Sequence, residues 1–401
     1  MRTSPPQLAC LASLPLIIGC PSQPLDSGDQ DLPRIEGLVQ VVPSEGLPAE
    51  VVVQDANNNL DVLEVDGRVF LAWRTAPSHF ASADAMLHVV SSTDEQTWRH
   101  ETSIQLGTDL REPRLMYLKE SRRIFLYFAV LGEIPTAFEP QGTQYVVRDD
   151  EGHWSDPEWL RQDDFIPWRI KSERNQPQLM GYTGGGAIYD PKEGFPALEI
   201  EWLTTQDGVS WDPIVEDMPV VHTGGASEAD FTYQDGGDLV VVARNEAGDS
   251  FGFGSLICTA EKGNLAAWQC AHDLRKFDSP LLFDRAGRYW LIARRNLTES
   301  GNYDLEMNDL SLEEQSLQYE AAYWGEPKRC SLWQVFPDDL VVLHTLDLPS
   351  MGDTCFPSAL DRGDGHYTVY NYSNDVEGED LPWNAGQVAP TYIYKQELYV
   401  P

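Results

Sequence analysis

Arginines and acidic residues recur in this 401-residue chain at matching positions beside short pairs of apolar segments. Arginine binds a carboxylate through two parallel hydrogen bonds, and a pair of acids supplies a general acid with a base or nucleophile. Gathered in one place, these side chains would form a pocket for a polyhydroxylated or carboxylated ligand. Eight of these residues lie near the start of the first segment of a pair: Asp61, Arg111, Arg114, Arg169, Glu228, Asp230, Asp278 and Asp353. Four residues lie at the end of the second segment of a pair: Arg74, Arg244, Arg294 and Tyr372.

The apolar segments are joined in pairs by tight polar turns at six places, which begin near Leu60, Pro113, Arg169, Ala229, Pro280 and Pro357. A repeat of about 50–75 residues indicates units that cannot bury their apolar faces alone. Four-stranded units repeated around an axis form a β-propeller. No period of 3.6 residues is sustained, so helix should be scarce. The sequence therefore predicts an all-β protein with a six-bladed propeller.

The expected blades cover residues 59–107, 108–158, 163–220, 225–270, 277–348 and 353–399. Residues 35–53 are expected to add an outer strand to the last blade, which would close the ring and leave no open sheet edge. The extra length at 298–325 predicts a surface insertion. Because innermost strands of a propeller begin near the central channel, the charged residues at these starts should ring one mouth of it.

The N-terminus is typical of an exported protein. Arg2 precedes an apolar stretch at 8–19 that is too short to span a bilayer. Ile17-Ile18-Gly19-Cys20 resembles a bacterial lipobox, which implies a signal peptide at 1–19 and lipidation of Cys20. Residues 20–33 would be a tether and 34–401 the propeller. The resemblance implies an envelope lipoprotein, at the outer membrane or cell surface; an ordinary secretory signal is the alternative.

The formal net charge is −36, from 28 basic and 64 acidic residues. Such a field repels nucleic acids and anionic membranes, so no nucleic-acid partner is expected and membrane contact should be limited to the lipid anchor. It also opposes the approach of an anionic sugar. No Asp-x-Asp-x-Asp-Gly loop is present, and neither a metal nor another cofactor is expected.

Besides Cys10 and Cys20, the chain has four cysteines, an even number that predicts two disulfides in an oxidising compartment. Of the three possible connectivities we favour the local one, Cys258–Cys270 and Cys330–Cys355. A zinc site is the alternative, but the cysteines have neither CxxC spacing nor a nearby histidine.

Several segments resemble the sialidase superfamily, across about residues 50–399. Residues 92–98 and 205–211 are similar to its Asp boxes, which are structural and lie on the face away from the active site; the first copy lacks the usual glycine. Glu228-Ala229-Asp230 followed by Ala243-Arg244-Asn245 resembles the fourth region of the family. Tyr370-Asn371-Tyr372-Ser373 resembles its last, tyrosine-bearing blade.

In sialidases three arginines hold the substrate carboxylate, a Tyr–Glu pair is the nucleophile, and an aspartate is the acid/base. The resemblance implies that Arg244 and Arg294 belong to the triad and that Tyr372, or Tyr370, pairs with Glu228. The Phe/Tyr-Arg-Ile-Pro motif of the first triad arginine is absent. The remaining assignments are Arg111 or Arg114 for that arginine, Asp61 or Asp84 for the acid/base, Asp230 as a further catalytic carboxylate, and Arg74, Arg169, Asp278 and Asp353 as substrate-binding residues. His79 is interpreted as a loop residue rather than a base.

Two functions follow as expectations. The first is a surface lipoprotein whose sialidase-like propeller processes a glycan, with exo-glycosidase activity. The second is a non-catalytic propeller that binds a glycan or a protein with the same face. For any single Arg–Asp pair the structural alternative is that it ties two blades together.

Overall fold

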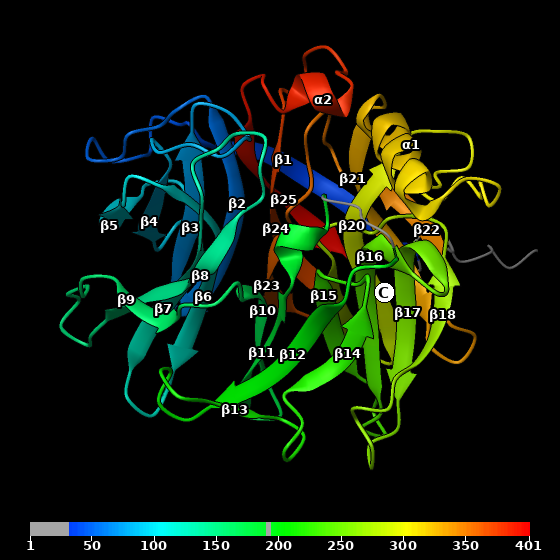
Figure 1. Ribbon diagram of the computed structural model, residues 1–401. Helices are drawn as coiled ribbons and strands as arrows, with labels where there is room; N and C mark the ends of the chain where they lie inside the picture. The colour runs from blue at the N-terminus through cyan, green and yellow to red at the C-terminus, as the bar shows by residue number, and fades with distance from the viewer. Residues whose placement is uncertain (1–31, 190–193) are drawn as a thin grey trace, which may run out of the picture.

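The computed structural model describes residues 32–189 and 194–401. Its strands form six antiparallel sheets around a central axis (Figure 1), which confirms the predicted all-β, six-bladed propeller. Over the two described ranges, no helix is long and apolar enough to cross a membrane. The predicted signal peptide and Cys20 lie outside the described residues.

The first three blades follow the chain order. The first contains β2 (Ala56–Val65), β3 (Arg68–Ala76), β4 (Met86–Ser92) and β5 (Arg99–Ile104). The second contains β6 (Asp109–Leu118), β7 (Arg123–Leu131), β8 (Pro140–Arg148) and β9 (Glu158–Arg161). The third contains β10 (Ile166–Glu173), β11 (Gln176–Thr183), β12 (Leu198–Thr205), β13 (Trp211–Pro213) and β14 (Val220–Gly224), with a short 3-10 helix, η1 (Gly185–Ala187), after β11.

The other three blades complete the ring. The fourth contains β15 (Ala229–Tyr233), β16 (Leu239–Asp249), β17 (Gly252–Ala260) and β18 (Gln269–Asp273). The fifth contains β19 (Leu281–Arg285), β20 (Arg288–Asn296), β21 (Lys328–Phe336) and β22 (Val341–Asp347). The sixth contains β23 (Ser358–Gly363), β24 (His366–Ser373), β25 (Tyr392–Tyr399) and, outermost, β1 (Arg34–Val42).

Each of the six sequence repeats is the first hairpin of a blade, and its first strand is the innermost one. The turn residues explain several of these hairpins. Asp66 and Gly67 join β2 to β3 with φ of 50° and 74°, and Asp364 and Gly365 join β23 to β24 with φ of 51° and 76°. Two consecutive positive φ angles match the right-handed twist of antiparallel strands, and Asp-Gly accepts them at little cost.

The N-terminal strand closes the ring. β1 pairs antiparallel with β25, so the outer edge of the last blade is covered, as predicted. The blue β1 and the red β25 lie side by side in Figure 1. Apolar side chains fill the spaces between neighbouring sheets; Leu115 and Phe128 of the second blade, for example, pack with Ala72 and Val89 of the first.

The two Asp boxes have the expected turn geometry. Asp94 Oδ1 accepts hydrogen bonds from the N–H groups of Gln96 and Thr97 at 2.9 and 2.8 Å. Where the second box has Gly208 at φ 80°, the first has Glu95 at φ 55°. The missing glycine therefore leaves the turn intact, with a non-glycine residue in the left-handed region.

Both disulfides form as predicted. Cys258–Cys270 links β17 to β18 within the fourth blade, and Cys330–Cys355 links β21 of the fifth blade to the segment before β23 of the sixth. The second bond therefore joins neighbouring blades covalently.

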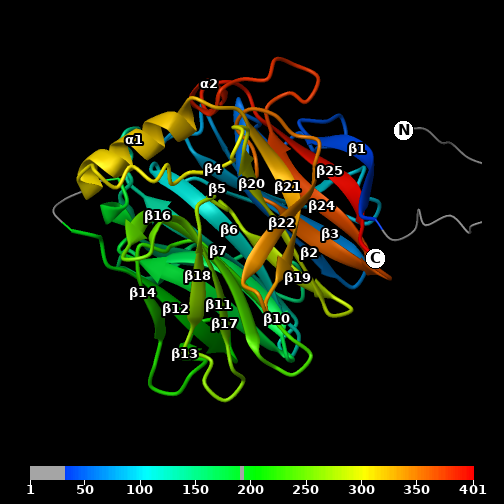
Figure 2. The ribbon, with the colours of Figure 1, turned by 90° about the vertical axis from the view of Figure 1, so that its right-hand side faces the viewer.

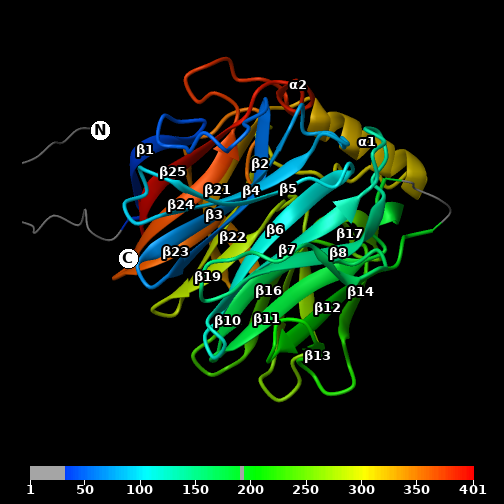
Figure 3. The same cartoon turned by 90° about the vertical axis from the view of Figure 1, so that its left-hand side faces the viewer.

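The predicted insertion in the fifth blade contains a helix that the sequence analysis did not identify. α1 (Leu312–Trp324) begins at a capping box in which Ser311 and Glu314 bond each other's backbone N–H. Its apolar periodicity is weak, which explains the omission. α1 and the short α2 (Trp383–Gly386) lie on the same face of the propeller, seen from two sides in Figures 2 and 3.

Candidate functional site

A cavity of about 500 Å³ lies on the face that carries α1 and α2; we call it the upper cavity. Its walls come from the starts of the innermost strands, from the segment at 135–138, and from the two helices. Residues from every blade line it, including Asn59, Glu112, Trp168, Glu228, Arg294 and Tyr372. Polar residues from the strand starts therefore do surround one channel mouth, although not all of those that the sequence predicts.

Backbone irregularities aim some of these side chains at the channel. Asn59 has φ 41° at a shift of the β2–β3 register, and Glu112 has φ 51° at a shift of the β6–β7 register. A β-bulge leaves one residue unpaired and turns its side chain. Asn59 Nδ2 donates to both carboxyl oxygens of Glu112 at 3.2 Å, so two neighbouring blades meet at this point.

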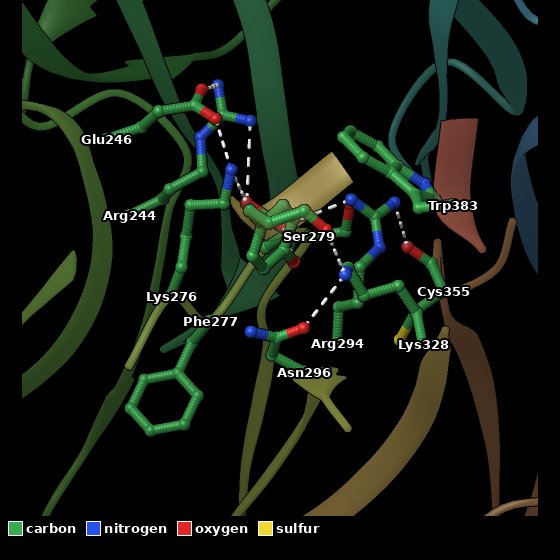
Figure 4. Close-up of polar contacts among 12 residues, drawn as sticks. Arg244, Glu246, Lys276, Phe277, Ser279, Arg294, Asn296, Lys328, Cys355 and Trp383 are labelled. Atoms are coloured by element: carbon green, nitrogen blue, oxygen red, sulfur yellow. Dashed lines mark hydrogen bonds and ion pairs between the residues drawn. The ribbon is translucent and has the colours of Figure 1, made fainter. Parts of the chain in front are cut away.

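Arg244 occupies one side of the upper cavity between two carboxylates. Its Nη1 lies 2.9 Å from Glu228 Oε1, and its Nη2 lies 3.2 Å from Glu246 Oε2. Glu228 Oε2 also accepts the N–H of Ser279 at 2.7 Å. Lys276 forms a second ion pair with Glu246, so this corner is a closed network of charges (Figure 4).

Arg294 is held equally firmly. Its Nη1 lies 3.0 Å from Asp278 Oδ2, and its Nε donates to the carbonyl of Thr354 at 2.6 Å. Asp278 also accepts the hydroxyl of Tyr323 from α1 at 2.6 Å. The surrounding cations hold the pKa of Asp278 at about 2, although burial alone would raise it. Asp278 is thus a permanently charged anchor behind the cavity wall.

His79 and Tyr372 share a buried carboxylate. Asp353 Oδ2 lies 2.6 Å from His79 Nδ1, and Asp353 Oδ1 accepts the Tyr372 hydroxyl at 2.9 Å. Burial lowers the pKa of His79, so its ring is neutral at pH 7. Burial and the negative charge of Asp353 raise the pKa of Tyr372 well above its usual value. His79 thus lies in a loop, as expected, and its ring also lines the cavity.

Burial raises the pKa of three carboxyl groups that line the upper cavity, Glu228, Glu112 and Glu320. Burial raises the pKa of Glu228 to about 7, against the attraction of Arg244 and with repulsion from Asp278 and Glu112. Burial also raises the pKa of Glu112, against the attraction of Arg114 and Arg111. Among the described residues, Glu112 forms hydrogen bonds only with Asn59 and no ion pair with an arginine. Glu228 and Glu112 therefore lie in one cavity and both hold their protons more tightly than an exposed glutamate does.

Other predicted site residues lie deeper in the channel. Asp230 is fully buried, accepts the N–H of Leu282 at 2.6 Å and pairs with Lys171 at 2.7 Å. Arg114 stacks on the rings of Trp168 and Phe356, at 5.1 and 4.6 Å from their centroids. Burial lowers the pKa of Arg114 to about 10. Both side chains bridge innermost strands of different blades.

A second cavity of about 930 Å³ opens at the other end of the channel; we call it the lower cavity. Asp61 and Arg169 line this one, away from the upper cavity. Asp61 accepts the Ser358 hydroxyl at 2.7 Å and the N–H of Leu115 at 2.8 Å. These bonds tie the first blade to the sixth and to the second. Asp61 therefore has the structural role given above as the alternative, that of joining neighbouring blades.

The two remaining arginines share Asp109. Arg74 is fully buried, with its Nη2 2.7 Å from Asp109 Oδ1, and Arg111 lies 2.5 Å from Oδ2 of the same carboxylate. Arg111 lines the upper cavity, whereas Arg74 is packed behind it and also donates to the carbonyl of Phe80 at 2.9 Å.

The predicted residues therefore divide into three groups. Five line the upper cavity: Arg111, Glu228, Arg244, Arg294 and Tyr372. Three hold these side chains from behind: Arg74, Asp278 and Asp353. Four lie deeper in the channel or at its other end: Asp61, Arg114, Arg169 and Asp230. Glu112 is one of the charged strand starts expected at the channel mouth, but nothing in the sequence indicates a catalytic or binding role for it. The positive φ that turns it toward the cavity has no sequence signal.

No protein-family model and no curated protein matches this sequence. Among solved structures, a protein of unknown function from Dyadobacter fermentans matches with a TM-score of 0.60 and 15% identity, over 92% of this chain and 99% of that one. The Trypanosoma rangeli sialidase in complex with the inhibitor DANA matches with a TM-score of 0.54 and 12% identity, over 86% of this chain and 55% of that one. The Hadza microbial sialidase Hz136 matches with a TM-score of 0.51 and 13% identity, over 85% and 65%.

The chain thus spans less than two thirds of these two sialidases. At such low identities the similarity establishes the fold alone. Together with the six sheets and the Asp-box turns, it identifies the architecture: the chain is a six-bladed β-propeller of the sialidase-like type.

Proposed function

We propose that the protein processes a glycan in the upper cavity, as a glycoside hydrolase-like enzyme. The observation that carries this proposal is the pair Glu112 and Glu228, two carboxyl groups that line one cavity and repel each other electrostatically. A carboxyl group that keeps its proton near neutral pH is a competent general acid. Its ionised partner supplies the base or nucleophile that glycoside cleavage requires.

The apolar part of the cavity wall supports a sugar ligand. Phe80, Tyr189, Trp324 and Trp383 line the cavity beside the charged residues. Ligand sites combine such aromatic surfaces with a few convergent polar groups. The aromatic rings would pack against the C–H face of a sugar, and the carboxyl groups and His79 would bind its hydroxyls.

Non-catalytic binding of a glycan or a protein is the second candidate. Tyr372 hydrogen bonds Asp353 and Arg294, and in the described part of the chain no hydrogen bond joins it to Glu228. Its raised pKa makes it a poor nucleophile at neutral pH. The Tyr–Glu pair implied by the sialidase resemblance is therefore not assembled here, which favours binding over the sialidase reaction.

The test is a screen of the full chain against neutral and acidic aryl glycosides, repeated with Glu228→Gln and Glu112→Gln. Loss of proton transfer costs about 10²–10⁴-fold in rate, so at least one variant should lose turnover by roughly 100-fold. Glu173→Gln is the matched control, because Glu173 lines the lower cavity and burial also raises its pKa.

Turnover that persists in both variants of the upper cavity would contradict this site. No turnover, with binding that disappears in Arg244→Ala, would instead support the non-catalytic candidate.

We further propose that Cys20 anchors the protein to the bacterial envelope through a lipid. The lipobox-like Ile17-Ile18-Gly19-Cys20 supports this. Growth with a labelled fatty acid should label the wild-type protein and leave Cys20→Ala unlabelled. Equal labelling of both proteins would contradict the anchor.

A further inference from the structure

We infer that the upper cavity accepts an uncharged sugar and rejects a carboxylated one. The inference rests on the proposed function, which supplies the glycan, and adds the class of sugar. It follows from the state of the three cations that line the cavity, Arg111, Arg244 and Arg294. To hold a ligand carboxylate, an arginine needs a free pair of parallel N–H groups.

Every side-chain nitrogen of Arg244 already has a polar partner within the protein. Nε donates to Ser227 Oγ at 3.2 Å, Nη1 lies 2.9 Å from Glu228, and Nη2 lies 3.2 Å from Glu246. The side chain is only 9% exposed. A ligand carboxylate would have to displace Glu228 or Glu246 and leave a buried charge without its partner, which is costly.

The side-chain nitrogens of Arg294 also have partners within the protein, and Figure 4 shows the polar groups around this residue. Nη1 pairs with Asp278 at 3.0 Å and Nε donates to a backbone carbonyl at 2.6 Å. Nη2 donates to the Tyr372 hydroxyl at 3.3 Å. The Cζ atom of Arg294 also lies 4.9 Å from the centroid of the Trp383 ring, so an aromatic side chain covers part of the guanidinium.

Arg111 already uses two of its nitrogens for contacts within the protein. Its Nε lies 2.5 Å from Asp109 and its Nη2 donates to the carbonyl of His79 at 2.8 Å. Asp109 is completely buried and also pairs with Arg74, so it holds both arginines in place.

The acids that line the cavity outnumber these cations. Four glutamates, Glu112, Glu228, Glu246 and Glu320, face three arginines. Asp278, Asp109 and Asp353 lie directly behind the wall. A ligand carboxylate would enter a region where each arginine already pairs with a carboxyl group of the protein, inside a protein with a net charge of −36. A sugar hydroxyl, in contrast, donates to these carboxylates without any such penalty.

The experiment compares sugars that differ only in the carboxylate. Methyl glucoside, galactoside and mannoside are each titrated against the corresponding methyl uronide, with the methyl glycoside of sialic acid added. Because Trp324 and Trp383 line the cavity, intrinsic fluorescence reports binding to the unmodified full chain. We expect at least one uncharged sugar to bind about tenfold or more tightly than its uronide.

Preferred binding of a uronide or of the sialoside would overturn this inference and leave the proposed glycan function standing. If no sugar bound and none were cleaved, the proposed function would fail and this inference with it. The comparison needs no variant and so does not depend on the folding of one.

A variant tests the physical cause. In Asp278→Asn the carboxylate that neutralises Arg294 is lost, so the preference should move toward the uronide by about tenfold. Asp347→Asn is the matched control, since Asp347 pairs with the neighbouring Arg295 at a half-exposed site, 2.6 Å apart. An unchanged preference in folded Asp278→Asn protein would contradict internal neutralisation as the cause.

Discussion

At the scale of single residues, the chemistry of the upper cavity depends on which charges stand next to which. Glu228 and Asp278 are both buried carboxyl groups near Arg244. Asp278 has three cations around it, which hold its pKa at about 2. Glu228 has one close cation and repelling neighbours, and its pKa rises to about 7. The same functional group is thus an anchor in one position and a proton donor in the other.

The raised pKa of Glu228 predicts a pH-dependent stability. Unfolded protein ionises this group above its ordinary pKa of 4.5, whereas folded protein keeps the proton until about pH 7. The contribution of Glu228 to the free energy of unfolding is therefore fully present below pH 4.5 and is lost as the pH rises to 7. The melting temperature of Glu228→Gln relative to wild type should rise between pH 5 and 8 by roughly 2–4 °C.

Thermal melts at pH 5, 6, 7 and 8 measure this difference. Glu120→Gln, at an exposed position, is the control and should show a constant difference from wild type. A constant difference for Glu228→Gln as well would mean that Glu228 ionises normally in the folded protein.

At the scale of elements, α1 connects the insertion of the fifth blade to the site. Tyr319 and Tyr323 of this helix are buried, and Ser316, Leu317, Glu320 and Trp324 line the upper cavity. The helix therefore serves both as a wall of the cavity and as a support for Asp278. The insertion was predicted from its length, but its helix depends on tertiary packing more than on its own apolar pattern.

Tyr323→Phe should destabilise the protein by about 1–3 kcal/mol, because a buried carboxylate loses a hydrogen bond. The bond concerned is the one from the Tyr323 hydroxyl to Asp278. Urea unfolding measures the change. Tyr117→Phe is the matched control, since Tyr117 is half-buried and has no hydrogen-bonding partner among the described residues. Equal stability of the two variants would show that the bond contributes nothing.

At the scale of the whole molecule, a strand closes the ring and a disulfide joins two consecutive blades. β1 pairs with β25 in the last blade, and Cys330–Cys355 joins the fifth blade to the sixth. A propeller has no central core that spans all blades, so closure keeps each blade packed against two neighbours.

Replacing both Cys330 and Cys355 by serine should lower the unfolding free energy by about 3–4 kcal/mol. The bond closes a segment of 25 residues, against 12 for Cys258–Cys270. The double serine variant of Cys258 and Cys270 is the comparison, and the chain-entropy argument predicts a smaller loss of about 3 kcal/mol for it. A larger loss in that variant would contradict a closing role for the bond between blades.

The sequence by itself determined the architecture of this protein. Six period-2 hairpins, with Asp-Gly in some of their turns, predict the six blades, because alternation and turn chemistry are local properties. Proximity along the chain predicted the pairing of the two disulfides, and the strand starts predicted polar residues at the channel mouth.

Only the tertiary structure decided which polar side chains meet in the upper cavity. Glu228 lines that cavity and Asp230, two residues later, is buried in the channel; Asn59 and Asp61 are separated in the same way. For Asn59 a register shift and a positive φ set this difference, and neither has a clear sequence pattern. The partners also come from distant blades: Asp353 meets His79 across 274 residues. Charge state depends on such contacts, so the acids able to transfer protons emerge only when the ring is assembled.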